Sequence, residues 1–99
     1  MLFRSGSVYV PNSFTPNDDN LNEIFKATGK NLGTFQMLIF NRWGAKVFES
    51  HLIDVGWDGK YLGIPAPSGI YVWQIIAKDP NGKSFFATPI AVGTVALIR

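Results

Sequence analysis

A polar loop near the amino terminus carries the side chains best suited to chemistry in this sequence. It reads NDDNLNE over residues 17–23, and its amide and carboxylate oxygens are the hard donors that calcium prefers. The alternating acids and the distal bidentate glutamate of an EF-hand are missing. An Asx-rich turn, whose side chains accept hydrogen bonds from backbone N–H groups, explains the same residues. Both interpretations stay open, and the candidate calcium ligands are Asn17, Asp19, Asn22 and Glu23.

The rest of the chain offers little evidence of a catalytic site. His51 is the only histidine, there is no cysteine, and no serine–histidine–acid motif is recognisable. The remaining candidate acids lack the paired spacing of a hydrolase. We therefore predict that the protein is not an enzyme and uses no cofactor apart from the calcium considered above. The acids in question are Glu49, Asp54, Asp58 and Asp79.

The composition indicates one folded domain rather than a disordered tail. The chain has 99 residues, of which 46% are hydrophobic and 14% aromatic. Its net charge is +2, and the nine lysines and arginines form no basic stripe, so we expect no nucleic-acid partner. No apolar run is long enough to span a membrane. We divide the chain into residues 1–7, a linker or cloning remnant, and a domain over residues 8–99.

Strand signals separated by turn residues recur along the chain, whereas helix periodicity is nearly absent. Short apolar runs occur over 8–14, 23–29 and 34–50, the last as a hairpin with its turn at NRWG. The run over 69–79 is apolar on both faces, as in a central strand, and a DPNG turn leads from it into one or two final strands. We therefore predict an all-β, immunoglobulin-like antiparallel β-sandwich of about seven strands. We expect its core to include Leu38, Phe40, Trp57, Tyr71 and Ile75.

Two turn signals and a group of aromatic residues crowd together in GWDGKYLGIPAPSGIYVW, residues 56–73. As framework, Asp58 accepts hydrogen bonds from local backbone N–H groups, Gly59 adopts a left-handed conformation, and Trp57 covers the edge of the core. An alternative interpretation makes the aromatic residues an exposed platform that binds sugar, in an adhesive or carbohydrate-binding module. That platform would consist of Trp43, Trp57 and Tyr61.

Four segments in a fixed order carry a family resemblance: PNSFTPNDDNLNEIF, LIFNRWGAKVFES, GWDGKYLGIPAPSGIYVWQI and GTVALIR. Together they resemble the gliding-motility-associated carboxy-terminal domain, the type B sorting domain of the Bacteroidetes type IX secretion system. The resemblance covers residues 8–99. The family pattern in the first loop is Pro-Asn-Gly-Asp-Gly, and here Asp18 and Asn20 replace its two glycines. Aspartate and asparagine tolerate the left-handed region best after glycine, so the loop conformation can survive.

The resemblance implies protein export rather than catalysis. Such a domain is a sorting signal that directs a larger amino-terminal cargo across the outer membrane. It implies recognition by outer-membrane translocon components similar to PorP and SprF, and a cargo that passes through the periplasm to the cell surface or the medium. No signal peptide is visible, so the resemblance implies a longer parent chain that carries one.

The last segment, GTVALIR, allows two interpretations that the sequence leaves open. One is an ordinary pairing strand with a basic end. The other adds recognition of this segment by the translocon, with the arginine pairing with a carboxylate or accompanying the terminal carboxylate into a polar site. Because the family-like residues run from Pro11 to Arg99, we expect the secretion machinery to recognise the folded sandwich rather than a short peptide. The recognition residues would be Val95, Leu97, Ile98 and Arg99.

The two interpretations of the NDDNLNE loop predict different responses to calcium. A calcium site stabilises the native state by mass action, so millimolar calcium would raise the melting temperature and a chelator would lower it. The Asp19→Ala variant would then lose this difference. A melting temperature that calcium leaves unchanged would support the Asx-rich turn.

Overall fold

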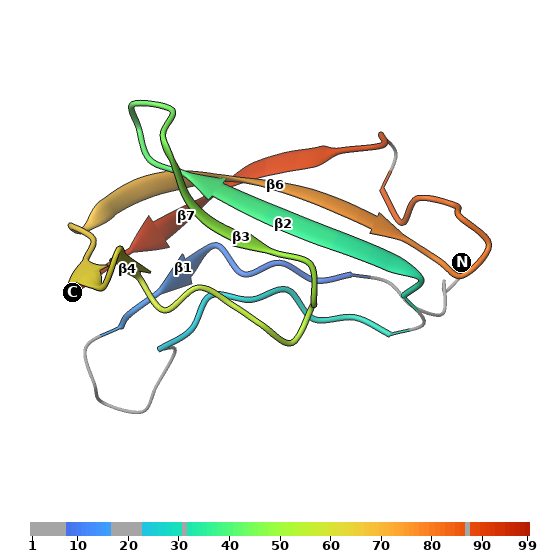
Figure 1. Cartoon of the computed structure of the whole chain (residues 1–99), viewed down its shortest axis with the longest axis horizontal. Helices are drawn as coiled ribbons and strands as arrows, with labels where there is room; N and C mark the ends of the chain where they lie inside the picture. Colours follow the sequence, from blue (N-terminus) through green and yellow to red (C-terminus); the bar gives the residue numbers. More distant parts are fainter. Residues whose placement is uncertain (1–7, 17–22, 31, 87) are drawn as a thin grey trace.

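The computed structural model describes residues 8–16, 23–30, 32–86 and 88–99, so the predicted linker lies outside the described residues. Within them the chain forms strands and no helix, and therefore no helix that could cross a membrane (Figure 1). The strands are β1 (Ser13–Phe14), β2 (Thr34–Phe40), β3 (Lys46–Ser50), β4 (Lys60–Tyr61), β5 (Ile64–Pro65), β6 (Gly69–Lys78) and β7 (Ala91–Leu97).

Five of the strands form the main sheet, in the order β1-β7-β6-β2-β3. The pairs β2–β3, β2–β6 and β6–β7 are antiparallel, whereas the short β1 runs parallel to β7. The prediction of a central strand over 69–79 is confirmed, because β6 lies in the middle of this sheet. A strand in that position is covered by neighbours on both edges, which agrees with its many β-branched and aromatic residues.

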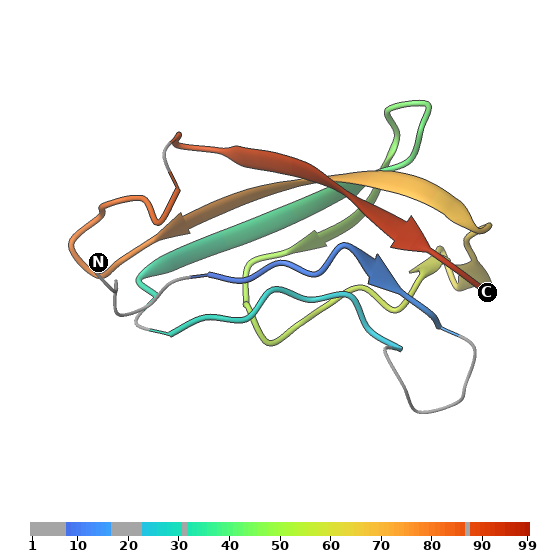
Figure 2. The same ribbon diagram turned by 180° about the vertical axis from the view of Figure 1, so that it is seen from behind.

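Extended segments and the β4–β5 hairpin make the second layer, which packs against one face of the main sheet (Figures 1 and 2). Single bridges connect these segments: Tyr9 pairs with Thr28, and Phe25 pairs with Trp57. The predicted strands over 8–14 and 23–29 are therefore mostly extended chain with few ladder hydrogen bonds. The all-β, immunoglobulin-like fold predicted from the sequence is confirmed, with one well-formed sheet and one irregular layer.

The core lies between the two layers and contains Trp57, Tyr71 and Ile75, as the sequence predicted. The expectation for Leu38 and Phe40 was wrong. Along β2 the buried side chains are instead Phe35, Met37 and Ile39, while Leu38 and Phe40 alternate to the outer face and are half-buried. Because both faces of this strand are apolar, its pattern does not say which face the second layer covers.

Trp57 joins the second layer to the main sheet. Its side chain is fully buried, and its ring centroid lies 5.5 Å from that of Phe14 and 4.9 Å from that of Tyr71. The indole N–H donates to the Lys60 carbonyl at 2.9 Å. The backbone N–H groups of Trp57 and Phe25 each donate to the other's carbonyl at 2.8 Å. Trp57 therefore contributes packing, a side-chain hydrogen bond and a backbone bridge to the irregular layer, alongside the buried Phe25 and Ala27.

The turn chemistry predicted around Trp57 is confirmed. The Asp58 carboxylate accepts a hydrogen bond from the Lys60 backbone N–H at 3.0 Å. Gly59 has a φ of 82°, in the left-handed region that glycine adopts without strain. At the DPNG turn, the Asp79 carboxylate accepts from the N–H groups of Asn81 and Lys83, both at 2.9 Å. Local side-chain-to-backbone contacts thus set these turns, as the residue types indicated.

Trp57→Ala should destabilise the domain far more than Trp43→Ala. Removing a fully buried tryptophan costs about 3–5 kcal/mol of unfolding free energy. Trp43 is 75% exposed and makes a cation–π contact, so its removal should cost no more than about 1 kcal/mol. Urea denaturation followed by circular dichroism measures both values. Equal losses for the two variants would contradict the role assigned to Trp57.

Candidate functional site

The structure divides the four predicted recognition residues into two buried and two exposed ones. Val95 and Leu97, at the end of β7, are 0% and 1% exposed and belong to the core. Ile98 is 51% exposed, and Arg99 is also exposed. A partner can therefore contact Ile98 and Arg99, whereas Val95 and Leu97 can act only through the fold.

Arg99 forms a clamp between the end of the chain and three other segments. Its guanidinium donates to the carbonyls of Ala66 (2.8 Å), Pro16 (2.9 Å) and Gly59 (2.7 Å). Its backbone N–H donates to the Ser68 hydroxyl at 3.1 Å. Among the described residues its hydrogen-bond partners are thus backbone carbonyls and a hydroxyl, not a carboxylate. The planar guanidinium fork is suited to this task because it presents several donors in fixed directions.

A cavity of about 440 Å³ opens beside this clamp. Its lining includes Glu23, the one candidate calcium ligand within the described residues, and Asp58 from the GWDG turn. Asn17, Asp19 and Asn22 lie outside the described residues. In the part of the chain that the structure describes, no three histidine or acidic residues are grouped as metal ligands usually are. The calcium site therefore stays a prediction.

The single histidine takes part in a surface charge cluster. The Glu49 carboxylate lies 2.5 Å from the Lys46 ammonium and 2.8 Å from the His51 ring nitrogen Nε2. The hydrogen bond from Lys46, followed by that from His51, lowers the pKa of Glu49. The His51 side chain is 63% exposed, and its hydrogen-bond partner within the described part of the chain is the Glu49 carboxylate.

The NRWG turn between β2 and β3 presents a tryptophan and an arginine to solvent. The Asn41 side-chain oxygen accepts from the N–H groups of Trp43 and Ala45, both at 3.0 Å, and Gly44 has a positive φ of 83°. This network fixes the turn without using the Trp43 ring. The Arg42 guanidinium carbon lies 4.5 Å from the centre of that ring, in a cation–π contact.

The β4–β5 hairpin presents apolar side chains at the same end of the molecule. Tyr61 pairs with Ile64, and the connecting residues Leu62 and Gly63 have φ angles of 54° and 79°. Two positive φ angles define a type I′ turn, in which asparagine or glycine is preferred. Leu62 is the only non-glycine residue with positive φ among the described residues, at a cost of about 1–2 kcal/mol. Its side chain is nevertheless 82% exposed.

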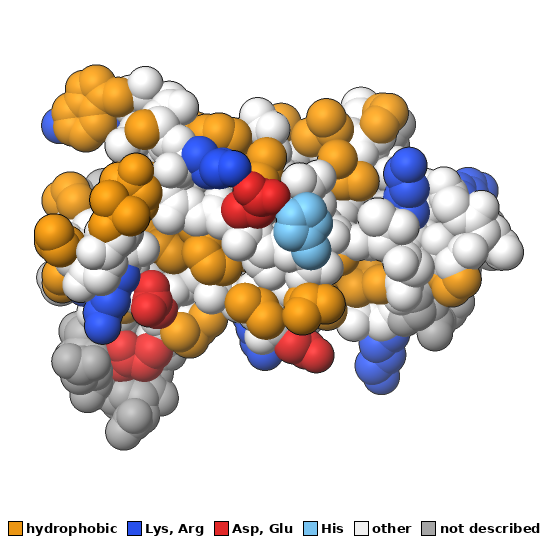
Figure 3. All heavy atoms as spheres, in the orientation of Figure 1, with side chains coloured by type: hydrophobic (Ala, Val, Ile, Leu, Met, Phe, Trp, Pro, Cys, Tyr) orange, Lys and Arg blue, Asp and Glu red, His pale blue; other side chains and the backbone are white. Residues whose placement is uncertain are grey.

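An apolar groove of about 250 Å³ lies between these two hairpins; we call it the hairpin groove. Tyr71 forms part of its lining and donates its hydroxyl to the Pro67 carbonyl at 2.7 Å, and burial raises the pKa of this phenol. Figure 3 shows apolar side chains gathered at this end of the molecule. The lining residues are Asn41, Trp43, Val47, Tyr61, Leu62, Ile64, Pro65, Ala66, Pro67 and Tyr71.

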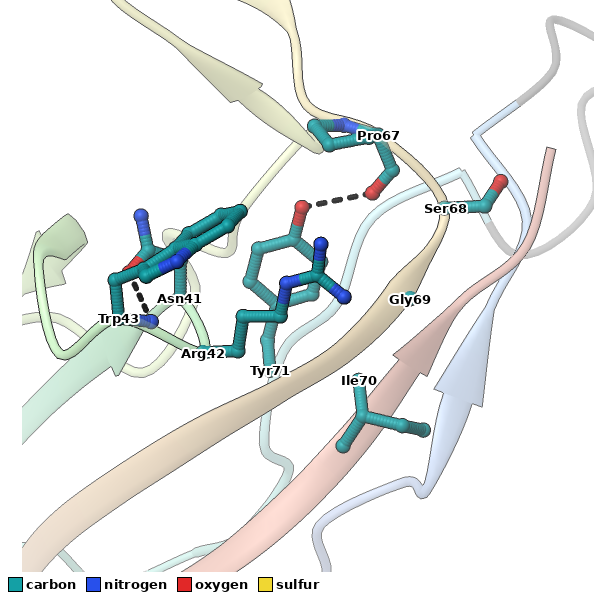
Figure 4. A pocket seen from close by; sticks show the side chains of 8 residues that line it. All are labelled: Asn41, Arg42, Trp43, Pro67, Ser68, Gly69, Ile70 and Tyr71. Carbon is teal, nitrogen blue, oxygen red and sulfur yellow. Dashed lines mark hydrogen bonds between the residues drawn. The ribbon is translucent and has the colours of Figure 1, made fainter.

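A small pocket of about 110 Å³ continues the hairpin groove toward Arg42 and Ser68 (Figure 4). The groove and the pocket share Trp43 and Tyr71 in their linings. Sequence reasoning missed this site, although an apolar residue in the tight turn of YLGIP is unusual and could have indicated it.

One of the three residues predicted to form an exposed sugar-binding platform is not exposed. Trp57 is fully buried and cannot contact a ligand. Trp43 and Tyr61, by contrast, are exposed and both line the hairpin groove. The three aromatic residues therefore lie in two separate places, Trp57 in the core and Trp43 and Tyr61 at the surface.

Arg99→Ala should lower the unfolding free energy by about 1–3 kcal/mol, because the variant loses three charge-assisted hydrogen bonds at a partly solvated site. Arg99→Lys should recover only part of this loss, since an ammonium group cannot match the planar fork. The exposed Lys83→Ala is the control and should change stability by less than about 0.5 kcal/mol. Urea unfolding provides the measurement; full recovery by lysine would show that charge alone matters.

A solved structure with the same fold comes from a study of PorZ, described as an essential bacterial surface component of the type IX secretion system of Porphyromonas gingivalis. The TM-score is 0.60 at 22% sequence identity, which supports the likeness of fold alone. The match covers 95% of this chain but 11% of the other, so this chain spans only a small part of that structure's length. No curated protein matches the chain.

The family comparison is more specific. The model of the CHU_C type IX secretion signal domain matches residues 8–88, which is most of the chain and includes the NRWG, GWDG and PSGIY motifs. The resemblance recognised in those motifs is confirmed by this match. The chain belongs to the family of type IX secretion signal domains.

Proposed function

We propose that this domain directs a larger cargo protein through the type IX secretion system, and that the machinery recognises the folded domain rather than a linear peptide. Membership of the signal-domain family carries the first half of this proposal. A parent protein with such a signal is exported to the cell surface or secreted. In our proposal the cargo lies amino-terminal to the domain and supplies whatever activity the whole protein has.

The Arg99 clamp supports recognition of a folded shape. Its guanidinium contacts Pro16, Gly59 and Ala66, which are distant from Arg99 in sequence and belong to segments that carry the family motifs. These motif segments meet at one end of the molecule only after the chain has folded. A receptor that contacts this end therefore distinguishes the folded domain from an unfolded chain of the same sequence.

The proposed route leads through the periplasm to outer-membrane components similar to PorP and SprF. The domain itself has a non-catalytic role in this proposal. Of the predicted recognition residues, Ile98 and the exposed part of Arg99 are offered to the receptor, and Val95 and Leu97 support them from the core.

An adhesive or carbohydrate-binding module is the second candidate function. It is favoured by one observation, the exposure of Trp43 and Tyr61 in a common groove. Saturable sugar binding on a glycan array, lost in Trp43→Ala while export of a fused reporter continues, would support this function instead.

Secretion of a fluorescent reporter in a competent host tests the main proposal. We expect export when the reporter carries residues 8–99. We expect none with residues 8–94, which lack two core residues and the clamp, or with residues 83–99 alone. The full-length Trp57→Ala domain should also fail, because it keeps the linear sequence but loses its largest buried side chain.

Each control in this experiment separates folding from recognition. Circular dichroism of the purified tails shows which of them fold. Efficient export by residues 83–99 alone would overturn folded-domain recognition. A truncated domain that folds but is not exported would place recognition directly on the end of β7 and Arg99.

A further inference from the structure

We propose that the hairpin groove and its adjoining pocket bind an extended peptide segment of a partner protein, with a large apolar side chain beside a carboxylate. The apolar side chain would lie between Trp43 and Leu62, and the carboxylate would pair with Arg42. This inference concerns binding by the domain itself, so it can be tested whether or not the domain is recognised in export.

The apolar walls of the groove are not explained by the needs of the fold. Trp43, Leu62 and Ile64 are 75%, 82% and 68% exposed, although they face a common hollow. Leu62 also holds a left-handed backbone conformation that asparagine or glycine would adopt more easily. An exposed side chain at a strained position contributes little to stability, which indicates a contact outside the domain.

The charges around the groove indicate a negatively charged occupant. Neither the groove nor the adjoining pocket has an acidic residue in its lining. The Arg42 guanidinium stacks on Trp43 but has no hydrogen-bond or ion-pair partner among the described residues. Its N–H donors are therefore available for a carboxylate, which an arginine can bind through two parallel hydrogen bonds. The neighbouring cavity is lined by two cations and two acids, Lys60, Arg99, Glu23 and Asp58, so the positive charge at the groove itself comes from Arg42.

The polar groups of the groove argue for a peptide rather than a sugar. The Asn41 side-chain oxygen already accepts two backbone N–H groups, and the Tyr71 hydroxyl already donates to Pro67. Few polar groups then remain for the many hydroxyls of a carbohydrate. A second copy of this chain that docks through the same groove is disfavoured because it would bring two Arg42 side chains together and supply no carboxylate from the groove. A peptide segment with an apolar and an acidic residue matches both the apolar lining of the groove and the positive charge of Arg42.

A display library of random dodecapeptides, selected on the complete 99-residue chain, tests this inference. We expect selected peptides to share a large apolar residue next to aspartate or glutamate. Fluorescence anisotropy of the strongest peptide should show at least tenfold weaker binding to Trp43→Ala. Binding should also weaken when the salt concentration rises. Val92→Ala, an exposed apolar position on the outer face of the main sheet, is the matched control and should bind like the parent chain.

Two variants distinguish a binding role from a structural one. Leu62→Asn should bind at least tenfold more weakly while its melting temperature stays equal or rises, because asparagine suits the turn. Arg42→Gln should weaken binding of the selected peptide, and so should replacing the acidic residue of the peptide by its amide. The two changes together should weaken binding little more than either change alone, because both remove the same ion pair.

Three outcomes would overturn the proposal. One is a selection that yields no peptide with an acidic and an apolar residue. Another is a selected peptide that binds Trp43→Ala and Leu62→Asn as well as the parent chain. A third is saturable binding of glycans or anionic vesicles, or concentration-dependent dimerisation, that Trp43→Ala abolishes while no peptide binds.

Discussion

The attachment of Trp57 to the main sheet is the interaction on which the rest of the structure depends. Among the described residues the second layer has two single bridges and the short β4–β5 hairpin, so few ladder hydrogen bonds hold it in place. Trp57 supplies the missing attachment, since it pairs with Phe25 through the backbone and packs against Phe14 and Tyr71. An irregular layer can be stable when one large buried side chain fixes its position.

The same residue helps to position the Arg99 clamp and the hairpin groove at one end of the molecule. The hydrogen bond from Trp57 to the Lys60 carbonyl fixes the start of β4, and the turn between them directs the Gly59 carbonyl toward Arg99. The β4–β5 hairpin then extends from this fixed point and carries Leu62 to the groove. The clamp and the hairpin groove are also adjacent, because Ala66 accepts a hydrogen bond from Arg99 and lines the groove.

Local interactions could be predicted from the sequence, whereas the choice between two similar faces could not. The roles of Asp58 and Gly59 depend on neighbouring residues alone, and the structure confirmed both. The expectation for Leu38 and Phe40 failed because both faces of β2 are apolar, and only the position of the second layer decides which is buried. For Leu62 the sequence offered one signal, an apolar residue in the YLGIP turn, but its left-handed conformation and its exposure depend on the formed hairpin.

The Arg99 clamp and the hairpin groove differ in what they contribute to the stability of the fold. The Arg99 clamp satisfies three backbone carbonyls, so its polar groups are used within the molecule and stabilise it. Leu62 instead holds a strained conformation and leaves its side chain in solvent. Stability alone would favour asparagine at that position. A domain that carries a signal must be stable and must also present a surface that a partner can bind. The chain meets the first requirement with buried aromatic packing and the clamp, and the exposed apolar side chains of the hairpin groove are the basis on which we propose a binding surface.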